Sequence, residues 1–554
     1  MTPYNQGRQQ FTLVAETCIW CPGFQTIPQP SVALRVCLEI ERVCAFGMAW
    51  IDKQLEPTSA HLLYLILSIF LILYALFSQF IRNRLHLSEP PLATLVGIAF
   101  GPRGAGLFDP KSWGWEDNVT QEASRIIVGV QVFAVGVELP RKYFKRHWKS
   151  VAILLGPVMT YSWLVTALLI FGVLRTEFST ALIISACLTP TDPVLAASVL
   201  NASQFSSRVP KRLRHMLSAE SGSNDGVSFP LLYVGLYVLI EPTAASAIKE
   251  WILDTILWKC LFGTLIGLFV GVCANRTLRF AHGSAYIATS FFFVFYFLLA
   301  ILCVGIGSTL GTDDFLVSFG AGTGFAWDGW FGSKTKETRL PEILDLMLNS
   351  SMFVYFGAII PWSEFGSSVL IPHLTVGRLI GLLILIILFR RIPIVVAMKR
   401  FIPDVKTYRE ALFCGHFGPM GVGAIFLVIE ARAQLETGTS LPLPHPPLHH
   451  PHQTAILTIW PVVCFIILGS IMIHGLSVAA ISIGGHYSRA EGERAPLIGG
   501  EVDELDGMEH EGGAGEVRKF LEWFLHSSRG LPRVYMLIAP LQSDSDFSDQ
   551  ASQI

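Results

Sequence analysis

The chain has 554 residues, of which 52% are hydrophobic and only 15% are charged, and its formal net charge is −2. Soluble proteins carry about 25% charged residues, so this composition excludes an ordinary soluble domain. The near-neutral charge also argues against a nucleic-acid partner. The sequence therefore predicts a protein with many membrane-spanning helices in contact with lipid.

Thirteen apolar stretches are long enough, or nearly long enough, to cross a membrane. In chain order they are residues 61–81, 92–108, 123–139, 150–174, 178–200, 216–240, 251–275, 285–308, 314–331, 343–361, 373–399, 408–432 and 454–483. The second, third and ninth are short or rich in glycine, so twelve spans are the alternative. The expected fold class is all-α and polytopic, with about 13 transmembrane helices.

Lysine and arginine are unevenly distributed between successive loops. One set of alternate loops holds 20 of these residues, and the opposite set holds 5. Basic residues collect on the cytoplasmic side of membrane proteins. With thirteen spans, this pattern places the C-terminus in the cytoplasm and the N-terminus outside.

The ends of the chain differ in composition from its apolar body. Residues 1–60 form an N-terminal extension without a signal-peptide pattern. Residues 61–483 form the expected transmembrane exchange domain. Residues 484–554 are polar, and residues 501–511 are acidic, so this segment is expected to be a mostly disordered cytoplasmic tail open to cytoplasmic regulators.

The fifth and sixth stretches each contain an aspartate at membrane depth. Asp192 lies between Pro190 and Pro193, and Asp225 directly follows Asn224. An ionised aspartate at the centre of a bilayer costs roughly 3 kcal/mol. At about 1.5 Å per residue, both side chains fall near the middle of a hydrocarbon core roughly 30 Å thick. We therefore expect the two carboxylates to meet there and to have a function.

Helix-breaking residues interrupt the fifth and twelfth stretches. The two prolines beside Asp192 should open the fifth helix around Thr191, and Gly418 with Pro419 should open the twelfth. Carbonyl groups released at that depth need a protein-lined cavity, where they suit an alkali cation. Matching interruptions in the two halves indicate inverted repeats whose broken helices cross. The alternative is a proline kink in which Asp192 caps the second half-helix.

Arg390 and Arg391 lie deep inside the eleventh stretch. One of them could reach the surface, but a pair at this depth should include a member neutralised by a carboxylate. Glu220 on the sixth stretch is the natural candidate. A functional and a purely structural ion pair both fit the sequence.

Three further titratable residues lie near helix interruptions or helix starts. His416 precedes the Gly-Pro interruption and could sense pH, although a helix-packing histidine is the simpler interpretation. Asp313 and Asp314 open the ninth stretch. They would either attract cations at the outer mouth or cap the helix.

Several strings, in order along the chain, resemble the fungal plasma-membrane Na⁺/H⁺ antiporters of the monovalent cation:proton antiporter superfamily. The strings include Thr191-Asp-Pro193, Glu220-Ser-x-x-Asn-Asp-Gly226, Gly311-Thr-Asp-Asp-Phe315 and His416-Phe-Gly-Pro419. The resemblance covers about residues 48–483. Members of the family tend to begin near a sequence like Met48-Ala-Trp50, so residues 1–47 look like an extension.

The resemblance implies a secondary transporter, not an enzyme, that needs no cofactor and works in the plasma membrane as a homodimer in sodium homeostasis, pH regulation and salt tolerance. The site residues that it implies are Thr191, Asp192, Ser221, Asn224 and Asp225 for the cation, and Glu220 with Arg391, or alternatively Arg390, for the ion pair.

Asp225 is expected to carry either a proton or a cation. Desolvation favours the neutral form of a carboxylic acid, so the two ligands should exclude each other. Intracellular Na⁺ or Li⁺, with K⁺ as a further candidate, would leave as external H⁺ enters by alternating access. The alternatives are an organellar K⁺/H⁺ exchanger and an intramembrane aspartyl protease, although such proteases have different sequences around their aspartates.

Overall fold

The computed structural model describes residues 58–85, 87–140, 142–192, 209–335, 340–366, 371–444, 447 and 449–487. These residues all belong to one unit of the chain, Met1–Gly500. The predictions for the N-terminal extension before residue 58, for Pro193 and for the C-terminal tail lie outside the described residues. Every regular element of the described part is helical.

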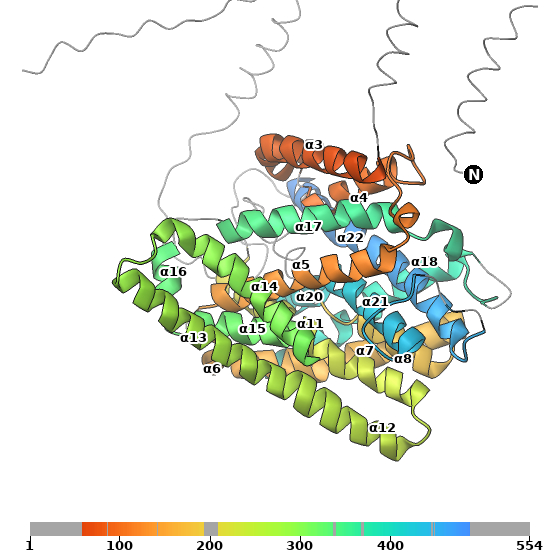
Figure 1. Cartoon of the computed structure of the whole chain (residues 1–554). Helices are drawn as coiled ribbons and strands as arrows, with labels where there is room; N and C mark the ends of the chain where they lie inside the picture. The colour runs from red at the N-terminus through yellow and green to blue at the C-terminus, as the bar shows by residue number, and fades with distance from the viewer. Residues whose placement is uncertain are drawn as a thin grey trace, which may run out of the picture. The chain divides into compact units, whose positions relative to one another are not determined.

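Each of the thirteen expected stretches overlaps a helix or a pair of consecutive helices, and the fifth stretch is described only as far as Asp192 (Figure 1). The helices are α3 (Ser59–Phe80), α4 (Glu89–Phe100), α5 (Glu116–Glu138), α6 (Tyr143–Ile153), α7 (Met159–Leu174), α8 (Phe178–Cys187), α11 (Lys211–Ile240), α12 (Ala244–Glu250), α13 (Gly263–Gly283), α14 (Phe292–Leu310), α15 (Asp314–Phe325), α16 (Trp330–Thr335), α17 (Leu340–Ile359), α18 (Val376–Phe389), α19 (Ile392–Met398), α20 (Tyr408–His416), α21 (Val422–Thr437) and α22 (Gln453–Tyr487). The π-helical segments η3 (Leu154–Val158) and η4 (Trp251–Phe262) join α6 to α7 and α12 to α13.

Six helices in the described part are long and apolar enough to cross a membrane. Shorter apolar helices include α4 and α8. The less hydropathic α11 and α21 bury polar and charged side chains inside the protein. The expected fold class, an all-helical polytopic membrane protein, is confirmed.

Local sequence sets where the helices begin and end. At the start of α20, Thr407 accepts a hydrogen bond from the amide of Glu410 at 3.1 Å, and the Glu410 side chain accepts one from the Thr407 amide at 3.4 Å. This reciprocal capping box satisfies two amides that the first turn leaves open. α14 and α21 both end at a glycine with a left-handed backbone, Gly311 and Gly438.

Glycines allow several helices to pack backbone against backbone. A β-carbon on Gly267 of α13 would overlap the carbonyl oxygen of Val317 on α15. One on Gly97 of α4 would overlap that of Val354 on α17. Small residues at such contacts are typical of membrane helices, where close approach replaces the missing hydrophobic driving force.

Two of the interrupted segments, α8 and α21, lie within the largest apolar core of the described residues, and α20 belongs to a second core. Buried apolar side chains of α7, α8, α11, α18, α21 and α22 form this core, and α8 packs on both α7 and α11. The site is therefore enclosed on several sides by the buried faces of these helices.

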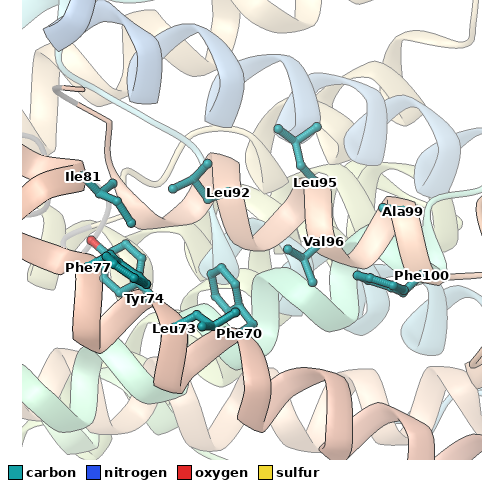
Figure 2. A pocket seen from close by; sticks show the side chains of 10 residues that line it. All are labelled: Phe70, Leu73, Tyr74, Phe77, Ile81, Leu92, Leu95, Val96, Ala99 and Phe100. Atoms are coloured by element: carbon teal, nitrogen blue, oxygen red, sulfur yellow. The ribbon is translucent and has the colours of Figure 1, made fainter. Parts of the chain in front are cut away.

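An apolar hollow of about 400 Å³ lies elsewhere, between α3 and α4 (Figure 2). Its lining includes Phe70, Tyr74, Phe77 and Val96 and contains no charged residue. None of the sequence-predicted site residues lines it.

Candidate functional site

The fifth stretch stops being helical where the prolines begin. α8 ends at Cys187, and the segment 189–192 has no helical backbone. Pro190 has no amide hydrogen and its ring clashes with the preceding turn, so the helix cannot continue. Thr189 turns its hydroxyl back to the carbonyl of Ser185 at 2.7 Å. The break therefore opens at the expected place, at least as far as Asp192.

The twelfth stretch is broken in the same way. α20 ends at His416 and α21 begins at Val422, so residues 417–421, which include Gly418 and Pro419, join two half-helices. The amides of the first turn of α21 point into this gap without helical partners.

The two breaks meet in the interior. The amide of Asp192 donates to the carbonyl of Pro419 at 2.8 Å, and the amide of Val422 donates to Asp192 Oδ2 at 3.0 Å. A carboxylate at the N-terminal end of a helix is stabilised by the free amides and by the helix dipole. Asp192 therefore joins the fifth stretch to the beginning of α21.

A polar triangle fixes the first break against α11. The amide of Thr191 donates to Asn224 Oδ1 at 3.2 Å, and Asn224 Nδ2 donates to Thr191 Oγ1 at 2.8 Å. The hydroxyls of Thr191 and Ser221 are 2.8 Å apart. All three side chains are buried. Their oxygens are hard ligands of the kind that alkali and alkaline-earth cations prefer.

Asp225 is one residue further along α11 and is only 2% exposed. It lies against Gly423, at the start of α21, and Asp192 lies against Gly421, two residues earlier. The structure thus brings Thr191, Asp192, Asn224 and Asp225, together with Ser221, to one buried place. A cluster of carboxylate and hydroxyl oxygens in a dry interior can bind a proton or a hard cation.

The two arginines have different partners. Arg391 makes two parallel hydrogen bonds of 2.6 Å to the carboxylate of Glu220, and its Nε donates to the carbonyl of Cys414 at 3.0 Å. Arg390 instead donates to the carbonyls of Leu188 and Gly418, one from each break. Arg391 is thus the partner of Glu220, and Arg390 ties the two breaks together.

Asp313 and Asp314 are both buried, at 0% and 4% exposure. Asp313 Oδ1 caps α15 by accepting from the amides of Phe315 and Leu316 at 2.9 and 3.0 Å. Asp314 accepts from Arg125 of α5 at 3.1 Å. This burial fits helix capping better than exposed, cation-attracting charges.

His416 lies at the end of α20, and its carbonyl is 3.0 Å from Nε2 of His474 on α22. Ser470 Oγ, one turn earlier on α22, accepts from the amide of Met420 at 2.9 Å. Ser470 and His474 therefore hold the second break, and sequence analysis missed them. Their spacing of four residues, which places both on one face of a helix, is the signal that could have pointed to them.

A second polar contact, also missed, joins α5 to the far half of α21. Arg432 is 3.0 Å from Asp117 and 3.1 Å from Glu436, and Gln121 donates to Glu430 at 2.9 Å. The sequence places Arg432 at the end of a span next to a loop. In the structure α21 continues to Thr437, and Arg432 is buried.

An all-helical polytopic chain, with two broken helices that meet at buried carboxylates, has the architecture of a membrane transport protein. The chain belongs to the sodium/hydrogen exchanger family, whose transmembrane region matches residues 66–484. This membership confirms the family resemblance noted in the sequence.

Curated relatives are similar over most of the chain. It is 45% identical over 443 residues to a probable Na⁺/H⁺ antiporter of Schizosaccharomyces pombe, which covers 79% of this chain and 58% of that protein. It is 46% identical over 443 residues to a Na⁺/H⁺ antiporter of Saccharomyces cerevisiae, covering 79% and 45%. A second Schizosaccharomyces pombe Na⁺/H⁺ antiporter is 36% identical over 447 residues, covering 79% and 93%.

The chain spans about half the length of the first two of these relatives, 58% and 45%. Among solved structures, the sodium proton antiporter MjNhaP1 of Methanocaldococcus jannaschii matches with a TM-score of 0.54 at 17% identity. That match covers 75% of this chain and 98% of the other. It shows that the two chains share a fold.

Proposed function

We propose that this chain is a secondary active antiporter that exchanges intracellular Na⁺ or Li⁺, and K⁺ as a further candidate, for external H⁺. The observation that carries the proposal is the meeting of two broken helices at the buried carboxylates of Asp192 and Asp225. The curated relatives named as Na⁺/H⁺ antiporters support it.

Asp225 is the shared carrier in this proposal. When a cation is bound, Asp225 is ionised and coordinates it together with Asp192, Thr191 and Ser221, while Asn224 holds Thr191 in place. When the cation leaves, Asp225 takes up a proton, because an uncompensated charge in the interior is costly. Only in these two neutralised states can the site change its access from one side of the membrane to the other at a low cost in free energy. This coupling makes the protein an exchanger rather than a channel.

The groups around the site hold its carboxylates in position. Glu220 and Arg391 neutralise each other and provide structural support without binding the cation. Arg390 satisfies carbonyls of both breaks, so the two segments move as one unit when access alternates.

The proposal extends to the setting of the protein in the cell. The chain is a multi-pass protein of the plasma membrane with its C-terminus in the cytoplasm. This orientation is supported by the 20 basic residues in one set of loops against 5 in the other. It works as a homodimer in lipid, and its tail is the site for cytoplasmic regulators. It needs no cofactor, because both substrates are simple ions.

Purified protein in proteoliposomes tests the function directly. A proton gradient should drive uptake of Na⁺ and Li⁺, and Asp225→Asn and Asp192→Asn should each abolish it. Asp109→Asn is the matched control, because Asp109 caps the short helix at Pro110–Trp113, away from the site. Exchange by Asp225→Asn at the wild-type rate would refute the assignment. A response to K⁺ alone would favour the organellar alternative.

A further inference from the structure

Two glycines at the start of α21 lie directly against the two site carboxylates. A β-carbon on Gly421 would overlap Oδ2 of Asp192, and a β-carbon on Gly423 would overlap Oδ1 of Asp225. Val422, between them, donates its amide to Asp192 at 3.0 Å. The carboxylates therefore rest on a surface of bare backbone at the N-terminal end of the half-helix.

A left-handed backbone does not explain these glycines. Neither has a positive φ angle, so neither position requires the left-handed conformation that favours glycine. Glycine also destabilises a helix relative to alanine, and Gly423 lies in the first turn of α21. What alanine would change at both positions is the space beside a carboxylate.

The close approach has two consequences for a bound ion. It allows the Asp192 carboxylate to reach the free amide of Val422, and it lets the Asp225 carboxylate lie directly beside the first turn of α21. It also sets how far apart the two carboxylates lie, because one is limited by the residue that caps α21 and the other by a residue of its first turn. Sites that bind ions tolerate displacements of only about 0.5 Å in their ligands.

We propose that Gly421 and Gly423 are positioning residues that set the distance between the Asp192 and Asp225 carboxylates, and through it the size of the cation that fits. This inference rests on the proposed function, in which these carboxylates bind the transported ion. Gly421 acts through Asp192 and Gly423 acts through Asp225. A methyl group at either position would push one carboxylate into the space that the ion occupies.

The test compares Gly421→Ala and Gly423→Ala with Gly381→Ala. Gly381 lies on α18 with nothing within 4 Å of its β-position, so its substitution makes the same chemical change without a clash. Exchange of Li⁺, Na⁺ and K⁺ is measured in proteoliposomes for the wild type and the three variants. For both site variants we expect the KM for Na⁺ to rise about tenfold or more, with a smaller change in kcat. Because Li⁺ is smaller, its kcat/KM should fall less than that of Na⁺. The Li⁺/Na⁺ ratio of kcat/KM should therefore rise.

A second measurement does not depend on turnover. Na⁺ that binds the native state raises the Tm of the detergent-purified protein. This shift should need more Na⁺ in Gly421→Ala and Gly423→Ala than in Gly381→Ala. If the wild type failed to exchange ions, the proposed function would be wrong. The dependence of Tm on Na⁺ would still show whether the glycines position a cation site.

Three results would overturn the inference. One is a KM and an ion preference equal to those of Gly381→Ala. Another is a fall in kcat at unchanged KM. The third is failure of both site variants to accumulate as folded protein while Gly381→Ala does, because that would indicate a purely structural role.

Discussion

The Glu220–Arg391 pair shows why a single buried residue can matter for the whole protein. Both side chains are nearly inaccessible, and they face each other through two hydrogen bonds of 2.6 Å. Taking two charges out of water is costly, and close pairing offsets much of that cost. Removing the charge of one partner is therefore expected to have a large effect on the free energy of unfolding.

Glu220→Gln should lower the free energy of unfolding by about 3–5 kcal/mol, because it leaves Arg391 buried without a countercharge. Chemical denaturation in detergent, followed by tryptophan fluorescence, would measure the change. Glu364→Gln is the matched control. Glu364 and Lys111 are half-exposed and 4.0 Å apart, so their loss should cost less than about 1 kcal/mol. Equal effects of the two variants would show that the buried pair does not stabilise the fold.

His215 gives a pH-dependent prediction at the same scale. It lies just before the expected span over residues 216–240, and burial together with Arg214, His147 and Lys211 lowers its pKa below 6.5. A histidine with a lowered folded-state pKa binds fewer protons when folded, so stability falls as the pH drops below 6.5 toward that lower pKa. His215→Asn should flatten this part of the curve of Tm against pH. A curve of unchanged slope would contradict the prediction.

The relation between the two broken helices is decided at the scale of elements. Half-helices leave carbonyls at one end and amides at the other. In this protein Arg390 satisfies carbonyls of both breaks, and Asp192 satisfies an amide of the second. The interruptions are thus held largely by side chains from other elements.

Arg390→Lys should therefore destabilise the protein by about 1–3 kcal/mol. A lysine carries one ammonium group and cannot reproduce the planar fork that reaches two carbonyls, so one buried carbonyl loses its partner. Arg378→Lys, on the partly exposed start of α18, where Arg378 makes a 3.4 Å contact with the carbonyl of His373, serves as the control. The test compares the free energies of unfolding of the two variants with that of the wild type. A loss no greater than that of the control would mean that Arg390 does not hold the breaks.

At the scale of the whole molecule, transport couples the site to both sides of the membrane. Proton and cation compete for Asp225 in the proposed mechanism, so a fall in pH should weaken Na⁺ binding. Once the site is mostly protonated, the apparent KM for Na⁺ should rise by about tenfold per pH unit, because the ligand must lose its proton before the cation binds. Initial rates in proteoliposomes across several pH values test this. A KM independent of pH would rule out a shared site.

The contact between α5 and α21 also matters at this scale. Arg432 bridges Asp117 on α5 and Glu436 on α21, and all three groups are largely buried. This ion pair resists separation of the two helices at that end of the site.

Much of the fold could be predicted from the sequence. The thirteen apolar stretches each overlap helices in the described part of the chain, because the length and the apolar character of a span are local properties. The interruptions at Pro190 and Pro419 were also predictable, because proline removes an amide wherever it lies. The pairing of a deep arginine with Glu220 followed from the cost of burying a lone charge.

Other features of the site were decided only by the tertiary structure. Whether Arg390 or Arg391 pairs with Glu220 depends on a rotation of one residue at the end of α18, which no pattern in the chain specifies. The roles of Ser470 and His474 arise from α22 packing on the second break. The contact of Gly423 with Asp225 joins residues 198 positions apart in the chain. Local chemistry determines where a helix must break, whereas packing between distant segments determines what fills the break.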